Sequence, residues 1–274
     1  MIDSLLSVPS YFEIGNLRIN FYGLISALSY LLGVLITIKN AKKRGFKTED
    51  IIVLALYVIP LCVIGARIYY VLFRLDYYTN FWDVFKIWEG GLGFYGGLIG
   101  GALGVVLYCA IHKKNFFALI DIIAPGLILG QALGRWGNFF NQEAYGYAVT
   151  DPALQWFPFA VYIDGSGWHL ATFFYESLWN FISFIGLELL LYRVEFKTYG
   201  MLGAFYLIFY GSGRVWIEGL RTDSLYWGSV RISQLLSGIF IIFGVLVLVW
   251  YFFKYHRKRD KNFEIIMKVL KTDP

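Results

Sequence analysis

Long apolar runs alternate with short polar connections along the 274 residues of the chain. A helix needs about 20 mostly apolar residues to cross a bilayer. No run shows sustained alternation with a period of two, which disfavours a β-barrel. The pattern predicts an all-α integral membrane protein, a single polytopic domain of residues 1–274 with seven transmembrane helices. The expected spans are 19–38, 51–73, 91–111, 116–134, 173–192, 200–217 and 232–253.

The composition agrees with this prediction, because 58% of the residues are hydrophobic, 16% are charged and the mean hydropathy is +0.58. Soluble domains carry about 25% charged residues. A disordered chain, a cytosolic enzyme and a nucleic-acid binder are therefore excluded. Cys62 and Cys109 both lie in apolar runs and offer neither a disulfide framework nor a zinc site. No Lys or Arg follows closely after Met1, so we expect no cleaved signal peptide.

The basic residues predict the orientation of the chain. Of 24 Lys and Arg, 16 lie in the 39–50, 112–115 and 193–199 connections and in the tail after residue 253, and five lie in the connections of the other side. Cytoplasmic loops carry the excess of Lys and Arg. We therefore expect the N-terminus outside, the C-terminus inside and a basic cytoplasmic tail over 254–274.

Two connections on the expected outer side, 74–90 and 135–172, are long and rich in aromatic residues. One interpretation is that they are arms anchored in the bilayer interface. The other is that they border an entry path for a lipid, since loops of this length are often functional. Both interpretations describe long aromatic arms on the outer face.

Three arginines, Arg67, Arg135 and Arg214, lie within or at the ends of expected spans. Each costs about 2.5–3.5 kcal/mol at the bilayer centre. A single one is explained by snorkelling or by an ion pair, such as that of Arg214 with Glu218 four residues later. The predicted orientation, however, places all three at the depth of the outer leaflet. Because a guanidinium group matches phosphate, this convergence favours a site for an anionic head group.

The glycines of the third span fall into two rows with a spacing of four residues. Gly91, Gly93 and Gly96 match a dinucleotide-binding fingerprint, but the strand that should precede it is missing. Small residues four apart instead allow close approach of two helix backbones. The sequence therefore predicts a tightly packed helix with two glycine faces: Gly93, Gly97 and Gly101, and Gly96, Gly100 and Gly104.

Polar groups crowd the end of the fourth span, where residues 134–146 read GRWGNFFNQEAYG. Desolvated polar groups need partners. A helix end capped by Asn side chains explains part of this pattern, but not the clustering of an arginine, an acid and amides. The residues concerned are Arg135, Asn138, Asn141, Gln142 and Glu143.

The 134–146 stretch resembles the signature of the prolipoprotein diacylglyceryl transferases almost residue for residue. Members of that family often have a histidine at the position of Tyr95, so a histidine base does not carry over. Many also have His-Pro-Thr where this chain has Leu170-Ala171-Thr172. Further blocks resemble the family in the same order: Asn20–Leu24, Gly65–Tyr70, Trp88–Leu92, Gly96–Gly100, Asp121 with Pro125, Tyr175–Ser177, and Tyr210–Gly211 with Arg214, Glu218, Arg221 and Asp223.

The resemblance implies an enzyme of the bacterial cytoplasmic membrane that moves the diacylglyceryl group of phosphatidylglycerol to the lipobox cysteine of a prolipoprotein signal peptide. A thioether forms and glycerol phosphate leaves, and no metal or organic cofactor is implied. Partners are phosphatidylglycerol, the prolipoprotein and membrane lipids, not nucleic acid. Arg135 and Arg214 then hold the leaving phosphate, with a hydrogen bond from Asn138. Glu143 and Glu218 orient these arginines, or Glu143 acts as a base.

Two tyrosines complete the set of candidate site residues. The Tyr95 phenol either relays the thiol proton or packs in the glycine-lined groove, and Tyr22 borders the lipid pocket. The alternative function is a transporter or flippase for an anionic lipid or solute. It requires a polar path to the cytoplasmic side, where the spans hold little beyond Asp121 and Glu188.

Overall fold

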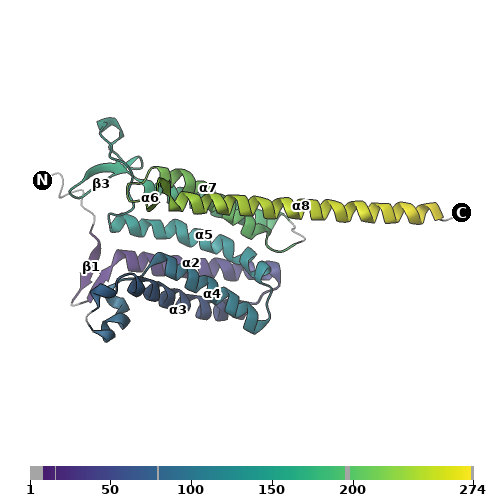
Figure 1. Ribbon diagram of the computed structural model, residues 1–274, viewed down its shortest axis with the longest axis horizontal. Helices are drawn as coiled ribbons and strands as arrows, with labels where there is room; N and C mark the ends of the chain where they lie inside the picture. The colour runs from purple at the N-terminus through teal and green to yellow at the C-terminus, as the bar shows by residue number, and fades with distance from the viewer. Residues whose placement is uncertain (1–8, 16, 79, 195–197, 273–274) are drawn as a thin grey trace. The chain divides into compact units, whose positions relative to one another are not determined.

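The computed structural model describes residues 9–15, 17–78, 80–194 and 198–272. The first eight residues, for which we expect no cleaved signal peptide, lie outside this part. A helix occupies each of the seven apolar segments (Figure 1). These helices are α2 (Phe21–Ala41), α3 (Thr48–Leu72), α4 (Phe94–His112), α5 (Phe116–Phe140), α6 (Thr172–Arg193), α7 (Met201–Gly219) and α8 (Ile232–Thr272).

Within the described residues, six of these helices are long and apolar enough to cross a membrane. The exception is α7, which has 19 residues but carries Arg214 and Glu218 in its second half. Helix α8 continues without interruption beyond the apolar segment that ends at Lys254 (Figure 1). The backbone of the expected basic tail is therefore helical as far as Thr272.

The all-α prediction is wrong in the connections, where the described residues form three antiparallel β-hairpins. Their strands have only two to four residues, too few for a period of two to stand out. Gly15 and Gly228 have φ of 60° and 63° in two of the turns, a conformation that glycine adopts without steric cost. The pairs are β1 (Tyr11–Ile14) with β2 (Leu17–Asn20), β3 (Ala160–Ile163) with β4 (Gly167–Leu170), and β5 (Tyr226–Trp227) with β6 (Val230–Arg231).

Short 3-10 helices fill much of the remaining connections. Three of them follow one another between α3 and α4, in the first of the two aromatic connections. These three are η2 (Leu75–Tyr77), η3 (Phe81–Phe85) and η4 (Ile87–Glu89). The other 3-10 helices among the described residues are η1 (Lys42–Arg44) and η5 (Pro152–Leu154).

The chain forms two compact units, whose boundaries fall inside α2 and α5. The smaller unit is Val34–Ile123, and the larger unit comprises the residues up to Gly33 and from Ala124 onwards. The smaller unit has a core that includes Ile51, Tyr108, Leu119 and Ile122, and contains a buried ion pair between Arg44 and Asp121 at 3.1 Å. The larger unit is built around Ala124, Ile128 and Leu187, covered by aromatic rings of α7.

Helices α3 and α4 pack with their backbones in contact. A Cβ atom on Gly96 would lie 2.2 Å from the carbonyl oxygen of Gly65, and one on Gly100 would lie 2.0 Å from that of Leu61. A side chain at either position would force the helices apart. The prediction of a glycine face at residues 96, 100 and 104 is thus confirmed.

Helix α5 runs past its expected end at residue 134 and stops at Phe140. The additional residues keep an aromatic face, and the Phe139 ring packs 5.0 Å from that of Phe173 on α6. Arg135 and Asn138 therefore lie on the last turns of a helix and not in a loop. This extension gives both side chains a rigid support.

Candidate active site

Four charged side chains of the larger unit form a continuous network, which we call the arginine cluster: Arg135 on α5, Glu176 on α6, and Arg214 and Glu218 on α7. Glu176 lies between the two arginines. Its Oε1 atom is 2.6 Å from Nη2 of Arg135, and its Oε2 atom is 2.8 Å from Nη1 of Arg214. Nη2 of Arg214 lies 2.7 Å from Oε2 of Glu218. Glu176 thus joins three helices, and Glu218 adds a second carboxylate to Arg214 within α7.

The arginine cluster is largely withdrawn from solvent. The exposed fraction of the side chain is 2% for Glu218, 4% for Glu176 and 13% for Arg214. Arg135 is the most exposed member, at 20%. Two cations and two anions balance, and ions at such depth are tolerated only when they are paired. The two carboxylates consequently hold both guanidinium groups in fixed orientations.

Close packing of α7 sets the position of Arg214. A Cβ atom on Gly213 would lie 2.2 Å from Cδ1 of Trp179 on α6, and one on Gly211 would lie 2.9 Å from the carbonyl oxygen of Ser237 on α8. The absence of both side chains allows α7 to approach its two neighbours. Arg214 and Glu218 are four residues apart and share one face of the helix.

A second chain of hydrogen bonds leads from Arg135 to the end of the 134–146 stretch. Nη1 of Arg135 donates to Oδ1 of Asn138 at 3.3 Å, and Nδ2 of Asn138 donates to Oε1 of Glu143 at 2.8 Å. Gln142 and Ala144, on either side of Glu143, have φ of 50° and 59°. Such values are costly for residues with a side chain, and strain of this kind gathers at functional sites.

The Tyr22 ring lies against the same end of α5. A Cβ atom on Gly137 would lie 2.8 Å from Cδ2 of Tyr22, so only glycine leaves room for the ring next to Asn138. Tyr22 is 41% exposed. The ring therefore forms an accessible aromatic surface beside the hydrogen-bonded chain.

This arrangement of residues occurs in a chain that matches a known family over most of its length. A family model described as prolipoprotein diacylglyceryl transferase matches residues 9–250. The chain belongs to this family. The family match thus extends well beyond the 134–146 stretch, and the helices identify a multi-pass membrane protein.

Individual members of the prolipoprotein diacylglyceryl transferase family are similar over nearly their full length. The phosphatidylglycerol–prolipoprotein diacylglyceryl transferase 1 of Clostridium perfringens is 43% identical over 88% of this chain and 93% of its own. The phosphatidylglycerol–prolipoprotein diacylglyceryl transferase of Clostridium botulinum is 42% identical over 92% and 99%. That of Streptococcus pneumoniae is 44% identical over 88% and 93%.

The structure joins five of the predicted site residues of this family member in one network: Arg135, Asn138, Glu143, Arg214 and Glu218. Their roles in the reaction stay predictions. Glu218 contacts Arg214 directly, whereas Glu143 reaches Arg135 through Asn138. Tyr95 belongs to the smaller unit, where its ring is 6.1 Å from that of Tyr69.

Arg67, which the sequence suggested as a third phosphate ligand, is bonded to the main chain of the smaller unit. Its Nε atom donates to the carbonyl oxygen of Val84 at 2.7 Å and its Nη2 atom to that of Asp83 at 2.8 Å. Its Nη1 atom donates to Gly90 at 2.7 Å and to Gly91 at 3.1 Å. This geometry is that of a residue that orders the connection between α3 and α4.

Glu176 is the member of the arginine cluster that the sequence did not single out as a site residue. The sequence indicates an acidic partner for an arginine only where the two residues are close along the chain, and Glu176 is far from both Arg135 and Arg214 in sequence. A signal was present, because α6 also buries the polar residues Ser177, Asn180 and Ser183. Polar residues at this helical spacing in an apolar span mark a face turned toward other helices and not toward lipid.

Proposed function

We propose that this protein transfers the diacylglyceryl group of phosphatidylglycerol to the thiol of a prolipoprotein lipobox cysteine. In this reaction the cysteine sulfur forms a bond to the carbon of the diacylglyceryl group that carries the phosphate. The bond from that carbon to the phosphate oxygen breaks, and glycerol phosphate leaves with the electron pair. The thiol proton passes to a base. The products are a thioether-linked prolipoprotein and glycerol phosphate.

The arginine cluster is the observation that carries this proposal. Charge develops on the phosphate as it leaves, and donors that are already oriented stabilise it without a cost of reorganisation. Each guanidinium has five N–H donors. In the contacts that the structure describes, Glu176 accepts one hydrogen bond from Arg214, and two further ion pairs join Arg135 to Glu176 and Arg214 to Glu218. These contacts do not use all the donors of the two guanidinium groups, and Arg135 is the more exposed of the two.

Two groups are candidates for the base that accepts the thiol proton. Glu143 is exposed and is held by Asn138, and a carboxylate within reach of the thiol can accept its proton. Tyr95 is half-buried, and its phenol can relay a proton because a hydroxyl group both accepts and donates a hydrogen bond. General bases contribute about 10²–10⁴-fold. The pH–rate profiles of Glu143→Gln and Tyr95→Phe distinguish the two candidates. The base is the residue whose replacement removes the increase of the reaction rate with rising pH.

We further propose that α7 is a seventh span and that the N-terminus lies outside the bacterial cytoplasmic membrane. At 1.5 Å per residue, the 19 residues of α7 extend about 28 Å, close to the thickness of the hydrocarbon core. Its two charges are paired, which reduces the cost of their burial. The 16 basic residues on the expected inner side, including the 254–274 tail, support this orientation.

The test is to reconstitute the purified protein in vesicles with labelled phosphatidylglycerol and a lipobox peptide. We expect the label to appear in a thioether on the peptide, and a peptide with serine in place of the cysteine to stay unlabelled. Movement of labelled lipid between leaflets with no thioether would overturn the proposal in favour of the flippase.

A further inference from the structure

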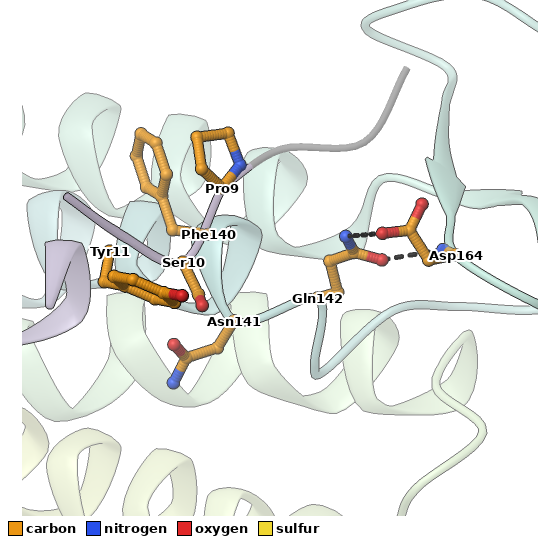
Figure 2. A pocket seen from close by; sticks show the side chains of 7 residues that line it. All are labelled: Pro9, Ser10, Tyr11, Phe140, Asn141, Gln142 and Asp164. Carbon is orange, nitrogen blue, oxygen red and sulfur yellow. Dashed lines mark hydrogen bonds between the residues drawn. The ribbon is translucent and has the colours of Figure 1, made fainter. Parts of the chain in front are cut away.

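A pocket of about 670 Å³ with both polar and apolar lining opens on the larger unit (Figure 2). None of its lining residues belongs to the arginine cluster. Three segments form it: the residues that begin β1, the end of α5 and the turn between β3 and β4. The residues that matter for its chemistry are Ser10, Tyr11, Phe140, Asn141, Gln142 and Asp164.

Two hydrogen bonds make one wall of this pocket firm. Nε2 of Gln142 donates to a carboxylate oxygen of Asp164 at 2.7 Å, and the main-chain N–H of Asp164 donates to Oε1 of Gln142 at 2.7 Å. Figure 2 shows the pair facing each other. Because the bonds join the end of α5 to the β3–β4 hairpin, the pocket has a built wall and is not a gap between loose loops.

The lining is suited to a neutral polar chain. Among the described lining residues there is no lysine or arginine, and Asp164 is the one charged group. A phosphate head group is therefore disfavoured, because it needs cationic donors. The lining offers amides, hydroxyls and aromatic rings, which match the peptide groups and side chains of a polypeptide.

Strand β1 adds main-chain partners for such a ligand. Within the described residues it pairs with β2 alone, so its second edge has no strand partner there. Peptides commonly bind by adding a strand to an exposed edge, while a neighbouring pocket takes their side chains. Tyr11, the first residue of β1, and Ser10 before it both line the pocket.

The pocket adjoins the hydrogen-bonded chain that ends at Glu143. Asn141 and Gln142 come three and four residues after Asn138, just beyond the end of α5, and the next residue is Glu143. A substrate whose reacting group lies near Arg135 and Asn138 would thus extend from there toward the pocket.

We propose that this pocket binds the segment of the prolipoprotein that follows the lipobox cysteine, in an extended conformation. The proposal rests on the function proposed above, which places the cysteine thiol near the arginine cluster. The volume lies within the 300–1,000 Å³ of pockets that bind small ligands, so it accommodates a short segment. The pocket then recognises the protein substrate, while the arginine cluster acts on the lipid.

The experiment compares two lipobox peptides that end one or six residues after the cysteine. We expect the longer peptide to have a KM about tenfold lower with wild-type protein, equivalent to about 1.4 kcal/mol. Asn141→Trp, and separately Ser10→Trp, fill the pocket and should abolish this gain. The short peptide should keep its kcat and KM in both variants, which shows that they fold and react normally.

Leu154→Trp provides the matched control, because Leu154 is also exposed, at 43%, and lies outside the pocket lining. It should keep the whole gain. The inference is overturned if the wild-type protein shows no gain with length, or if both pocket variants retain it, or if soluble glycerol phosphate removes it by competition. The proposed function survives each of these results as long as the short peptide is modified, and fails if no peptide is modified.

Discussion

In the larger unit Arg135 and Arg214 are paired with carboxylates, whereas in the smaller unit Arg67 is bonded to main-chain carbonyl oxygens. Both arrangements solve the same problem, because a guanidinium group withdrawn from water needs partners for its donors. The partners of Arg135 and Arg214 carry charge and come from side chains on helices. Those of Arg67 are neutral and come from one connection, between Asp83 and Gly91.

The difference between the partners separates two uses of a buried cation. Four carbonyl oxygens fix the path of the chain around Arg67, so its donors are spent on structure. The carboxylates of Glu176 and Glu218 instead fix the guanidinium groups, and Arg135 keeps the largest exposed fraction of the cluster. We therefore expect Arg135 and Arg214 to take part in the reaction, and Arg67 to stabilise the connection between α3 and α4.

The largest expected effect is that of Arg135→Ala. Removing an oriented donor to a developing negative charge costs about 10²–10³-fold in rate, so we expect thioether formation to fall by at least about 100-fold. Arg135→Lys keeps the charge but lacks the planar fork, and should recover only a small part. Initial rates of thioether formation, normalised to protein extracted from the membrane, measure both. Wild-type rates in correctly inserted Arg135→Ala would remove the arginine cluster from the mechanism.

The next effect concerns Glu176, which acts through the arginines and is thus a positioning residue. Glu176→Gln leaves two buried cations short of one negative charge, a change that costs about 3–5 kcal/mol in comparable pairs. We expect a lower unfolding midpoint and a kcat reduced about tenfold or more, with a smaller change in the KM for peptide.

Glu176→Asp keeps the charge on a shorter side chain and should restore part of kcat. The matched comparison is Asn180→Asp, which places a carboxylate one turn further along the same face of α6. If Glu176→Asp recovers stability but no activity, a geometric role stands. If kcat stays at the wild-type level in Glu176→Gln despite lower stability, Glu176 serves the fold alone.

Much of the fold follows from the sequence, because long apolar runs and glycines four residues apart impose geometry locally. The helices lie where hydropathy predicts them, and α3 and α4 meet at Gly96 and Gly100. The β-hairpins were missed because strands of two to four residues leave no period to detect. The last turns of α5 were missed because Arg135 and Asn138 look like loop residues until their partners are known.

The candidate site was predictable only in part, for a related physical reason. Arginines in apolar spans are conspicuous, and Glu218 is close to Arg214 in sequence. Glu176 is 41 residues from Arg135 and 38 from Arg214, and no local pattern pairs them. Arg67 shows the converse case, since its partners are carbonyl oxygens, which every residue possesses and no sequence pattern reveals.

A smaller effect on activity is expected for Arg67→Ala. This variant tests whether Arg67, bonded to main-chain carbonyl oxygens, serves the fold and not the reaction. The variant removes four hydrogen bonds to the 83–91 main chain, each worth about 1.5–3 kcal/mol for a charged donor. We expect faster amide hydrogen exchange and faster proteolysis within residues 80–93, with thioether formation reduced less than in Arg135→Ala.

Arg67→Lys retains a cation with fewer donors and should protect this connection only partly. Peptide-resolved hydrogen exchange on the protein in vesicles reports the change directly. A loss of activity as complete as in Arg135→Ala, with the 80–93 segment still protected, would show that Arg67 contributes to the reaction and that the division between the two sites is wrong.

The smallest effect is expected on stability, when the ion pair between Arg221 and Asp223 is broken. Nε and Nη2 of Arg221 donate to the two carboxylate oxygens of Asp223 at 2.8 and 2.7 Å, but the Asp223 side chain is 48% exposed. Burial raises the pKa of Asp223, yet the hydrogen bonds and charge of Arg221 outweigh it and leave the pKa below its ordinary value. Solvent screening limits the contribution of such a pair to about 1 kcal/mol or less.

The lowered pKa fixes the sign of the pH dependence. The folded state binds the proton of Asp223 less readily than the unfolded chain does, so the pair stabilises the fold above the ordinary pKa of aspartate, about 3.9, and the benefit is lost as the pH falls through the folded value. Asp223→Asn should therefore lower the unfolding midpoint slightly at pH 7 and not at all at the acidic end. If the unfolding midpoint of Asp223→Asn differs equally from that of the wild type at both pH values, shape and not charge holds this pair. If Asp223→Asn lowers the midpoint as much as Glu176→Gln does, burial does not separate the strong arginine pairs from the weak ones.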